Sequence, residues 1–206
     1  MAHNYKVDIK NERQNARPEI LKSASALFIE KGYLKTTVRE IAERSRLSIG
    51  GLYYHIQSKE DLLNWFYDNE SLSAATMAEI INKKLSESNC KDVLREALRL
   101  LLLRINEIQD HILFTYRETG NLPPEIREKV IKFDLLLVDL FKNIIEAGTR
   151  WGDFKVADLD LAAHDIIVLV DMWAFRRWAL RGHLSLEQFI DYQTNFIIAG
   201  LSYGML

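Results

Sequence analysis

Proline is nearly absent from this chain, and this scarcity constrains the fold more than any other feature of the sequence. The 206 residues include three prolines, at Pro18, Pro123 and Pro124. Because proline removes a backbone donor and clashes inside a helix, long stretches without it can form uninterrupted helices. Apolar residues recur at helical spacing, and no alternating strand pattern bounded by hairpin turns is visible. The sequence therefore predicts an all-α fold.

Residues that can cap a helix recur near the N-terminus. Thr37 with Glu40 has the form of a capping box, and Ser48 and Ser58 precede two further apolar stretches. Gly32 stands where a left-handed residue can end the first helix. The expected helices span about 18–32, 37–45, 48–56 and 59–86. Two short helices joined by a turn of about four residues, with one helix before and one after, form a helix-turn-helix unit.

Further helices are expected along the rest of the chain. Asp158 can cap the penultimate helix, and Ser185 with Gln188 forms a capping box for the last one. Clusters of glycine, proline and polar residues mark the expected breaks, at 86–89, 120–124, 148–155 and 182–183. The expected helices span about 91–109, 111–119, 124–148, 158–182 and 185–203.

Charge is distributed unevenly along the chain. Residues 1–60 contain 11 basic and 7 acidic residues, a net charge of +4, whereas the other 146 residues contain 16 basic and 22 acidic residues, a net charge of −6. A basic N-terminal part attached to an acidic body is typical of a two-part DNA-binding protein, since phosphate contacts favour clustered positive charge.

Several features indicate a cytoplasmic protein. Cys90 is the only cysteine, which excludes an intramolecular disulfide and fits a reducing compartment. No apolar run approaches the roughly 20 residues that a membrane-spanning helix needs. The N-terminus shows no apolar stretch of a secretory signal. We therefore expect a cytoplasmic protein that does not associate with a membrane.

The third expected helix has an unusual composition for a helix. Gly50 and Gly51 stand near its start, where each glycine costs ~1 kcal/mol relative to alanine. This cost is understandable if the backbone must approach another surface closely; the alternative is that the pair permits tight helix–helix packing. Leu52 and Ile56 are expected to face the core. The rings at positions 53–55, which can form hydrogen bonds, then suit contacts with phosphates and base edges.

These residues together form a recognisable pattern between Ile20 and Leu63. The pattern consists of Ile20-Leu21, Ala24, Phe28, Gly32, Thr36-Thr37-Val38, Ile41-Ala42, Ser48, Gly50, Leu52-Tyr53-Tyr54-His55, Ser58-Lys59 and Leu62. It resembles the DNA-binding domain of the TetR/AcrR family of transcriptional regulators. The rest of the chain is similar to that family only in length and helical layout.

The resemblance implies a role for each matching position. In a helix-turn-helix the second helix lies in the major groove. Thr37 and Lys59 would lie at phosphates, and Arg39 would point to the backbone or a base edge. Arg46 in the turn is a further phosphate contact. The residues expected to meet bases or phosphates from the third helix are Ser48, Ile49, Gly50, Tyr53, Tyr54 and His55. Lys10, Arg13 and Arg17 would add phosphate contacts, unless they form only a solvated tail.

The resemblance also implies three parts and two partners. Residues 1–16 would be a mobile basic arm, 17–62 the helix-turn-helix domain and 63–206 a ligand-binding and dimerisation domain. A homodimer would bind a palindromic double-stranded operator, because paired half-sites one turn apart require a two-fold protein. Apolar residues of the last two helices suit such an interface, although a monomeric core explains them equally: Leu161, Val168, Leu169, Met172, Phe189, Phe196 and Ile197.

A small hydrophobic or amphipathic inducer would release the repressor from its operator. Arginine is rarely buried without an anionic partner, so arginines beside tryptophans could receive a phosphate or carboxylate. The expected ligand-binding residues are Phe114, Arg117, Trp173, Arg176, Arg177 and Trp178. This pattern resembles relatives that sense acyl-CoA thioesters. Alternatively, the arginines pair with nearby carboxylates and the tryptophans belong to the core.

Two other classes of protein compete with this interpretation. For an enzyme, Glu107 with His111 and His164 with Asp165 are possible acid–base or metal groups, but no third ligand has a characteristic spacing. The sequence also lacks a nucleophile elbow, a glycine-rich phosphate loop and a Cys-x-x-Cys pair. We therefore expect no enzymatic activity, no metal site and no cofactor. A helical adaptor without DNA binding would explain the apolar helices but not the Gly-Gly-Leu-Tyr-Tyr-His segment.

Overall fold

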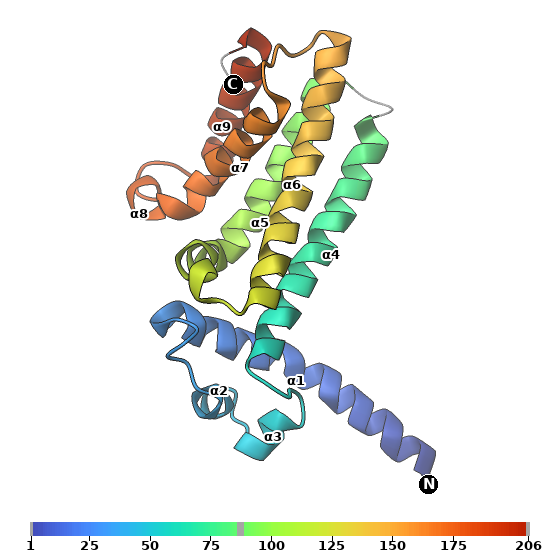
Figure 1. The fold of residues 1–206 in the computed structure, drawn as a ribbon, viewed down its shortest axis with the longest axis vertical. Coiled ribbons are helices and arrows are strands. Elements are labelled where there is room, and N and C mark those ends of the chain that lie inside the picture. Colours follow the sequence, from blue (N-terminus) through green and yellow to red (C-terminus); the bar gives the residue numbers. More distant parts are fainter. Residues whose placement is uncertain (1, 86–88, 205–206) are drawn as a thin grey trace. The chain divides into compact units, whose positions relative to one another are not determined.

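A computed structural model describes residues 2–85 and 89–204, with side chains from residue 16 onward. Within these ranges the chain forms helices and contains no strand (Figure 1), as the sequence predicts. The elements are α1 (Ala2–Lys31), α2 (Val38–Arg44), α3 (Ile49–Tyr53), α4 (Glu60–Leu85), α5 (Cys90–Glu118), the 3₁₀ turn η1 (Thr119–Asn121), α6 (Pro124–Trp151), α7 (Leu159–Phe175), α8 (Arg177–Leu180) and α9 (Leu186–Tyr203). None of the described helices is long and apolar enough to cross a membrane.

The helix caps predicted at Thr37, Asp158 and Ser185 are present. Thr37 and Ser185 each form a capping box with the residue three positions on, and the Asp158 carboxylate accepts hydrogen bonds from the N–H groups of residues 160 and 161. Before α4, the Asp61 carboxylate accepts from the N–H of Ser58 at 3.1 Å. These caps satisfy backbone donors that a helix start leaves unpaired.

Several predicted helix boundaries are wrong. Helix α1 continues back to Ala2, so that Pro18 lies inside it rather than in its first turn. The expected break near residue 110 is one non-helical residue, Ile108 (φ −110°, ψ 17°), inside a continuous α5. The helix expected to reach residue 182 ends at Phe175, because Arg176 leaves helical geometry (φ −106°, ψ 14°).

Gly148 does not end α6, as the sequence suggested, but lies within it. A Cβ atom at this position would lie 2.2 Å from Cδ2 of Phe154, a ring that is fully buried. The glycine is therefore required by the close approach of Phe154, and the chain leaves the helix only after Trp151.

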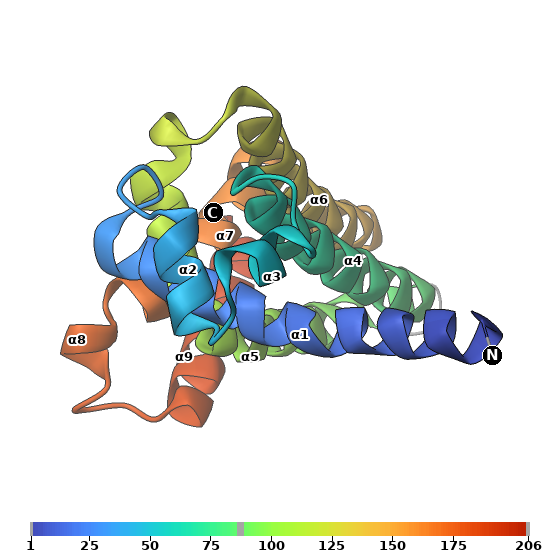
Figure 2. The same cartoon turned by 90° about the horizontal axis from the view of Figure 1, so that it is seen from below.

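The chain divides into two compact units. Unit 1 consists of Met1–Asn69 and Phe114–Val130, and unit 2 of Glu70–Leu113 and Ile131–Leu206. Unit 1 is larger than the expected domain 17–62, because the end of α5, η1 and the start of α6 join it. In unit 1, α2 lies beside α1 and α3 lies beside α2 (Figure 2).

The core of unit 1 combines the two segments. Buried residues of α1 to α4 pack with Phe114, Leu122, Ile126 and Val130 from the second segment. The core of unit 2 is separate and consists of apolar residues from α4, α5, α6, α7 and α9. Of the residues named in the sequence analysis, Leu52, Ile56 and Phe114 belong to the core of unit 1, and Trp173, Phe189 and Ile197 belong to the core of unit 2.

Candidate nucleic-acid interface

The turn between α2 and α3 is held by backbone hydrogen bonds. The N–H of Leu47 donates to the carbonyl of Ala42 at 2.9 Å, and Arg46 occupies the left-handed region (φ 58°). The Ser48 hydroxyl then accepts from the N–H of Gly51 at 2.9 Å, which caps α3. This is the predicted helix-turn-helix connection, and it leaves Arg46 and Ser48 exposed.

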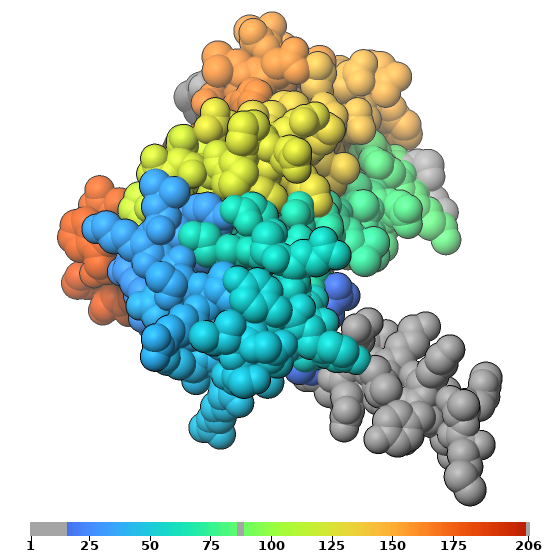
Figure 3. All heavy atoms as spheres, turned by 60° about the horizontal axis from the view of Figure 1, so that its bottom comes forward, coloured from blue at the N-terminus to red at the C-terminus, as the bar shows by residue number. Residues whose placement is uncertain are grey.

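Helix α3 has a buried and an exposed face. Leu52 is fully buried, and so is Ile56 just beyond the helix, both in the core of unit 1. On the other face, Ile49, Tyr53 and Tyr54 are each about half exposed, at 46%, 51% and 48%. The sequence predicted the same two faces, with Leu52 and Ile56 in the core and the tyrosines available for contacts. Figure 3 shows α2 and α3, coloured light blue to teal, on the surface of unit 1.

The two glycines of α3 differ in their surroundings. A Cβ at Gly50 would have no atom within 4 Å, whereas one at Gly51 would lie 3.1 Å from the Ser48 hydroxyl oxygen. Gly51 therefore leaves room for the cap. Gly50 packs against nothing in its own unit, so helix–helix packing does not explain it. The open space beside its backbone would allow close approach by another molecule.

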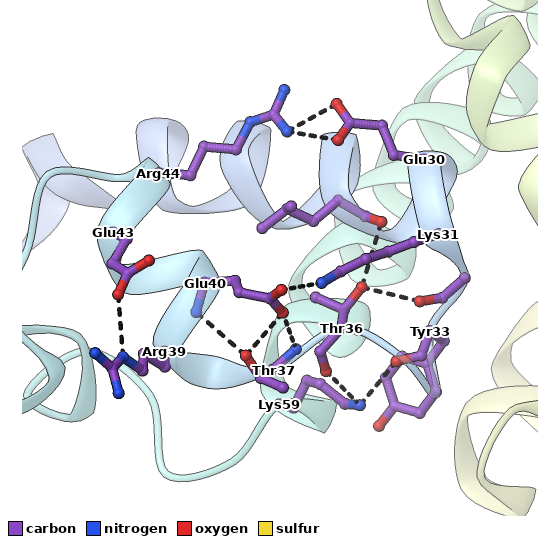
Figure 4. Close-up of polar contacts among 12 residues, drawn as sticks. Glu30, Lys31, Tyr33, Thr36, Thr37, Arg39, Glu40, Glu43, Arg44 and Lys59 are labelled. Carbon is purple, nitrogen blue, oxygen red and sulfur yellow. Dashed lines mark hydrogen bonds and ion pairs between the residues drawn. The ribbon is translucent and has the colours of Figure 1, made fainter.

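The start of α2 is fixed by a polar network (Figure 4). The Thr37 hydroxyl donates to the Glu40 carboxylate at 2.7 Å, and this carboxylate also forms an ion pair with Lys31. The pair with Lys31 and the hydrogen bonds from Thr37 lower the pKa of Glu40 to about 2. Arg39 is largely exposed and pairs with Glu43 at 3.1 Å. Thr37 and Arg39 thus lie at the surface on an ordered helix start.

Lys59 differs from the other residues assigned to DNA contact. Its ammonium donates to the carbonyls of Tyr33 at 2.8 Å and of Thr36 at 3.0 Å, and lies 4.0 Å from the centre of the Tyr33 ring. Desolvation lowers the pKa of Lys59. The structure therefore directs this lysine inward to the α1–α2 turn.

The N-terminal arm is tested only in part. Lys10 and Arg13 lie outside the described side chains, and the mobility expected for residues 1–16 stays a prediction. Arg17 is exposed, with its guanidinium 4.1 Å from the centre of the Trp65 ring. A cation–π contact of this kind orients the arginine at the surface of unit 1.

Both parts of the chain match models of one family. Residues 20–64 match the model "Bacterial regulatory proteins, tetR family", and residues 87–201 match "Tetracyclin repressor-like, C-terminal domain". The chain belongs to the TetR family. Its members are DNA-binding transcriptional regulators rather than enzymes.

Individual TetR-family proteins are similar over most of this chain. The transcriptional repressor KstR2 of Rhodococcus jostii is 26% identical over 183 residues, which cover 83% of each chain. A tetR-family regulatory protein from Rhodococcus RHA1 has 25% identity and a TM-score of 0.75, over 92% of this chain and 97% of the other. AibR, solved with isovaleryl coenzyme A and operator DNA, has 23% identity and a TM-score of 0.70, over 88% and 97%.

The expected ligand-binding residues are divided between the two units of this TetR-family chain. Phe114 and Arg117 belong to unit 1. The Phe114 ring stacks on Phe28 with ring centres 6.0 Å apart, and Arg117 donates to the carbonyl of Ile29 at 3.1 Å. Both residues therefore pack against α1, and their assignment to a ligand pocket stays a prediction.

The other four residues lie at the end of α7 and in α8 of unit 2. Trp173 is buried against Phe189, and its indole N–H donates to Asn106 at 2.9 Å; Arg177 pairs with Asp110. Trp173 and Arg177 therefore fit the alternative interpretation, in which the tryptophans belong to the core and the arginines pair with carboxylates. Arg176 and Trp178 are instead exposed and lie together, 5.0 Å from the guanidinium carbon to the ring centre.

Sequence reasoning missed one buried polar residue next to Ile108 in α5. Gln109 is 7% exposed and donates to the carbonyl of Asn106 at 2.7 Å, while its own side-chain oxygen is buried without a hydrogen bond. Burial lowers the pKa of His111 to about 4. The signal was present, because Gln109 continues the stripe of Leu98, Leu102 and Ile105 at helical spacing.

Glu107 and His164, two of the residues considered for an enzyme, lie at the surface of unit 2. Glu107 pairs with Arg104 at 2.7 Å, and His164 is exposed on α7. Among residues whose placement is described, no three His, Cys, Asp or Glu side chains are grouped so that they could hold a metal ion.

Proposed function

We propose that this protein is a transcriptional repressor that binds a palindromic operator as a homodimer in the cytoplasm. The observation that carries the proposal is the exposed face of α3, where Ile49, Tyr53 and Tyr54 surround the open backbone position at Gly50. A helix that enters the major groove needs polar and apolar contacts and a close backbone approach on one face. A protein-only adaptor would not require this combination.

The dimer would form through α7 and α9. Leu161, Val168 and Phe196 are 59%, 57% and 60% exposed, although they are apolar, and Tyr192 is 70% exposed. Phe189 and Ile197, which were assigned to the same interface, are instead buried in the core of unit 2. An apolar face of this kind is typical of an interface between subunits. Sedimentation of the wild type should therefore give the mass of a dimer.

Binding to DNA should depend on Tyr53 and on salt. We expect Tyr53→Ala to weaken operator binding by about 1–3 kcal/mol, because the ring is exposed on the groove face and supports little of the core. The affinity of the wild type should fall steeply as salt rises, since phosphate neutralisation releases counterions. Fluorescence anisotropy with labelled DNA from upstream of the protein's own gene measures both effects.

Tyr116→Ala is the matched control, because this exposed tyrosine lies at the end of α5 rather than on α3. Equal loss in both variants would argue against the assigned face. If the upstream fragment does not bind, selection from random DNA identifies the site before the variants are compared. Failure of that selection would refute the repressor proposal.

The proposed inducer is an acyl-CoA thioester. Arg176 with Trp178 exposes a cation and an aromatic ring at the α7–α8 junction, a combination suited to an anionic nucleotide, and Arg181 lies one turn on. Two proteins of the same fold were solved with such ligands, AibR with isovaleryl coenzyme A and FadR of Bacillus subtilis with stearoyl-CoA. The buried amide oxygen of Gln109 could accept a hydrogen bond from an amide N–H of the ligand.

Acyl-CoA should release the protein from DNA, and Arg176→Ala should weaken acyl-CoA binding about tenfold, the effect of removing one charge-assisted contact. Calorimetric titration with acyl-CoA of several chain lengths, free CoA and fatty acid measures the binding. Arg150→Ala, which removes an exposed arginine of α6, should leave it unchanged. If no thioester binds the wild type, the inducer class is wrong while the DNA proposal stands.

A further inference from the structure

We infer that Lys59 is a positioning residue, which supports DNA binding by holding the α1–α2 turn instead of contacting a phosphate. The inference rests on the proposed DNA-binding function and replaces the role that the family resemblance gave this lysine. The carrying observation is the direction of the ammonium, which donates to two backbone carbonyls within unit 1.

The Lys59 ammonium already satisfies two backbone carbonyls. Tyr33 and Thr36 are 3% and 2% exposed, and their carbonyls accept from Lys59 at 2.8 and 3.0 Å. The Tyr33 ring lies 4.0 Å from the same nitrogen. Moving the ammonium to a phosphate would remove these contacts and leave carbonyls of a buried turn without their donor, which is costly.

A second contact joins the start of α4 to the α1–α2 turn. Glu60, the next residue, accepts a hydrogen bond from the Tyr33 hydroxyl at 2.6 Å. Burial, together with this carboxylate, raises the pKa of Tyr33. Two consecutive residues at the start of α4 therefore hold both ends of Tyr33, its backbone carbonyl and its phenol.

Thr36 and Thr37 connect the turn to the proposed interface (Figure 4). The Thr36 hydroxyl donates to the carbonyl of Gly32 at 2.9 Å, which ties the turn to the end of α1. Thr37 follows directly and caps α2. By fixing the carbonyl of Thr36, Lys59 fixes the residue from which α2 begins, and α2 and its turn place α3.

The two roles for Lys59 predict different salt dependence. Loss of one phosphate contact reduces the slope of log K against log salt by about 0.9. Loss of a positioning contact weakens binding by a similar factor at every salt concentration. We therefore expect Lys59→Met to raise the operator Kd roughly tenfold with a nearly parallel salt line, as a carbonyl left without its donor would. Lys59→Arg, which keeps the charge and several donors, should recover most of the affinity.

Arg46→Gln provides the matched control for the salt line. The side chain of this arginine of the turn is exposed, so its removal should reduce the salt slope without altering thermal unfolding. Lys59→Met should lower the unfolding temperature. It should also speed amide hydrogen exchange at positions 37–41, where the capping box holds the start of α2, whereas a lost phosphate contact would leave exchange in the free protein unchanged.

Tyr33→Phe supplies a second variant, because it removes only the hydroxyl bonded to Glu60. It should weaken DNA binding and accelerate exchange at the same amides, although it removes no charge. A Lys59→Met protein with a reduced salt slope and wild-type exchange would overturn the inference. If Lys59→Met does not fold, unchanged affinity and exchange in Tyr33→Phe would overturn it equally. Failure of the wild type to bind any DNA would refute the proposed function itself.

Discussion

Phe114→Ala should destabilise unit 1 by about 3–5 kcal/mol, the usual cost of removing a buried phenylalanine. Phe114 is 3% exposed and stacks on Phe28, so truncation would leave a cavity between α1 and the end of α5. Because α2 and α3 share this core, operator binding should weaken as well. Native-state hydrogen exchange measures the effect, with faster exchange expected in α1 to α3 than in α9.

The neighbouring position shows whether the effect is specific. Leu113→Ala removes a half-buried side chain of unit 2 and should have a smaller effect on exchange in unit 1. If Phe114→Ala leaves unit 1 stable but abolishes acyl-CoA binding, the pocket role expected from the sequence is correct and the packing role is wrong.

Gly50→Ala should make the protein more stable and a poorer DNA binder. The new methyl group would have no atom within 4 Å in the free protein, and alanine in a helix is favoured over glycine by about 0.5–1 kcal/mol. On DNA the same methyl group would occupy the space through which the backbone approaches the bases. We expect affinity to fall tenfold or more, a loss of about 1–3 kcal/mol at a base contact. Urea unfolding and anisotropy measure the two opposite changes.

Gly51→Ala is the matched control. Its methyl group would lie 3.1 Å from the Ser48 hydroxyl oxygen, so the cap must shift, which offsets the gain from alanine by about 1 kcal/mol. The two neighbouring glycines should therefore differ in stability. Gly50→Ala with undiminished operator affinity would show that α3 does not approach DNA through its backbone.

The local features of this fold could be predicted from the sequence. The caps at Thr37, Ser48, Asp158 and Ser185 use a side chain within three residues of the backbone group that it satisfies, so a short stretch of sequence contains the whole interaction. The inward direction of Leu52 and Ile56 follows from helical periodicity for the same reason. The helix-turn-helix is made of such local interactions.

Only the tertiary structure decided the surroundings of Phe114, Arg117 and Lys59. Arg117 meets the carbonyl of Ile29 across 88 positions, and Lys59 meets that of Tyr33 across 26. An aromatic ring or a cation has the same appearance in a sequence whether it binds a ligand, a phosphate or its own backbone. The sequence alone determined the all-α fold and the caps, because these depend on near neighbours. The packing of distant segments decided which polar and aromatic groups the chain uses internally and which it leaves exposed for a partner.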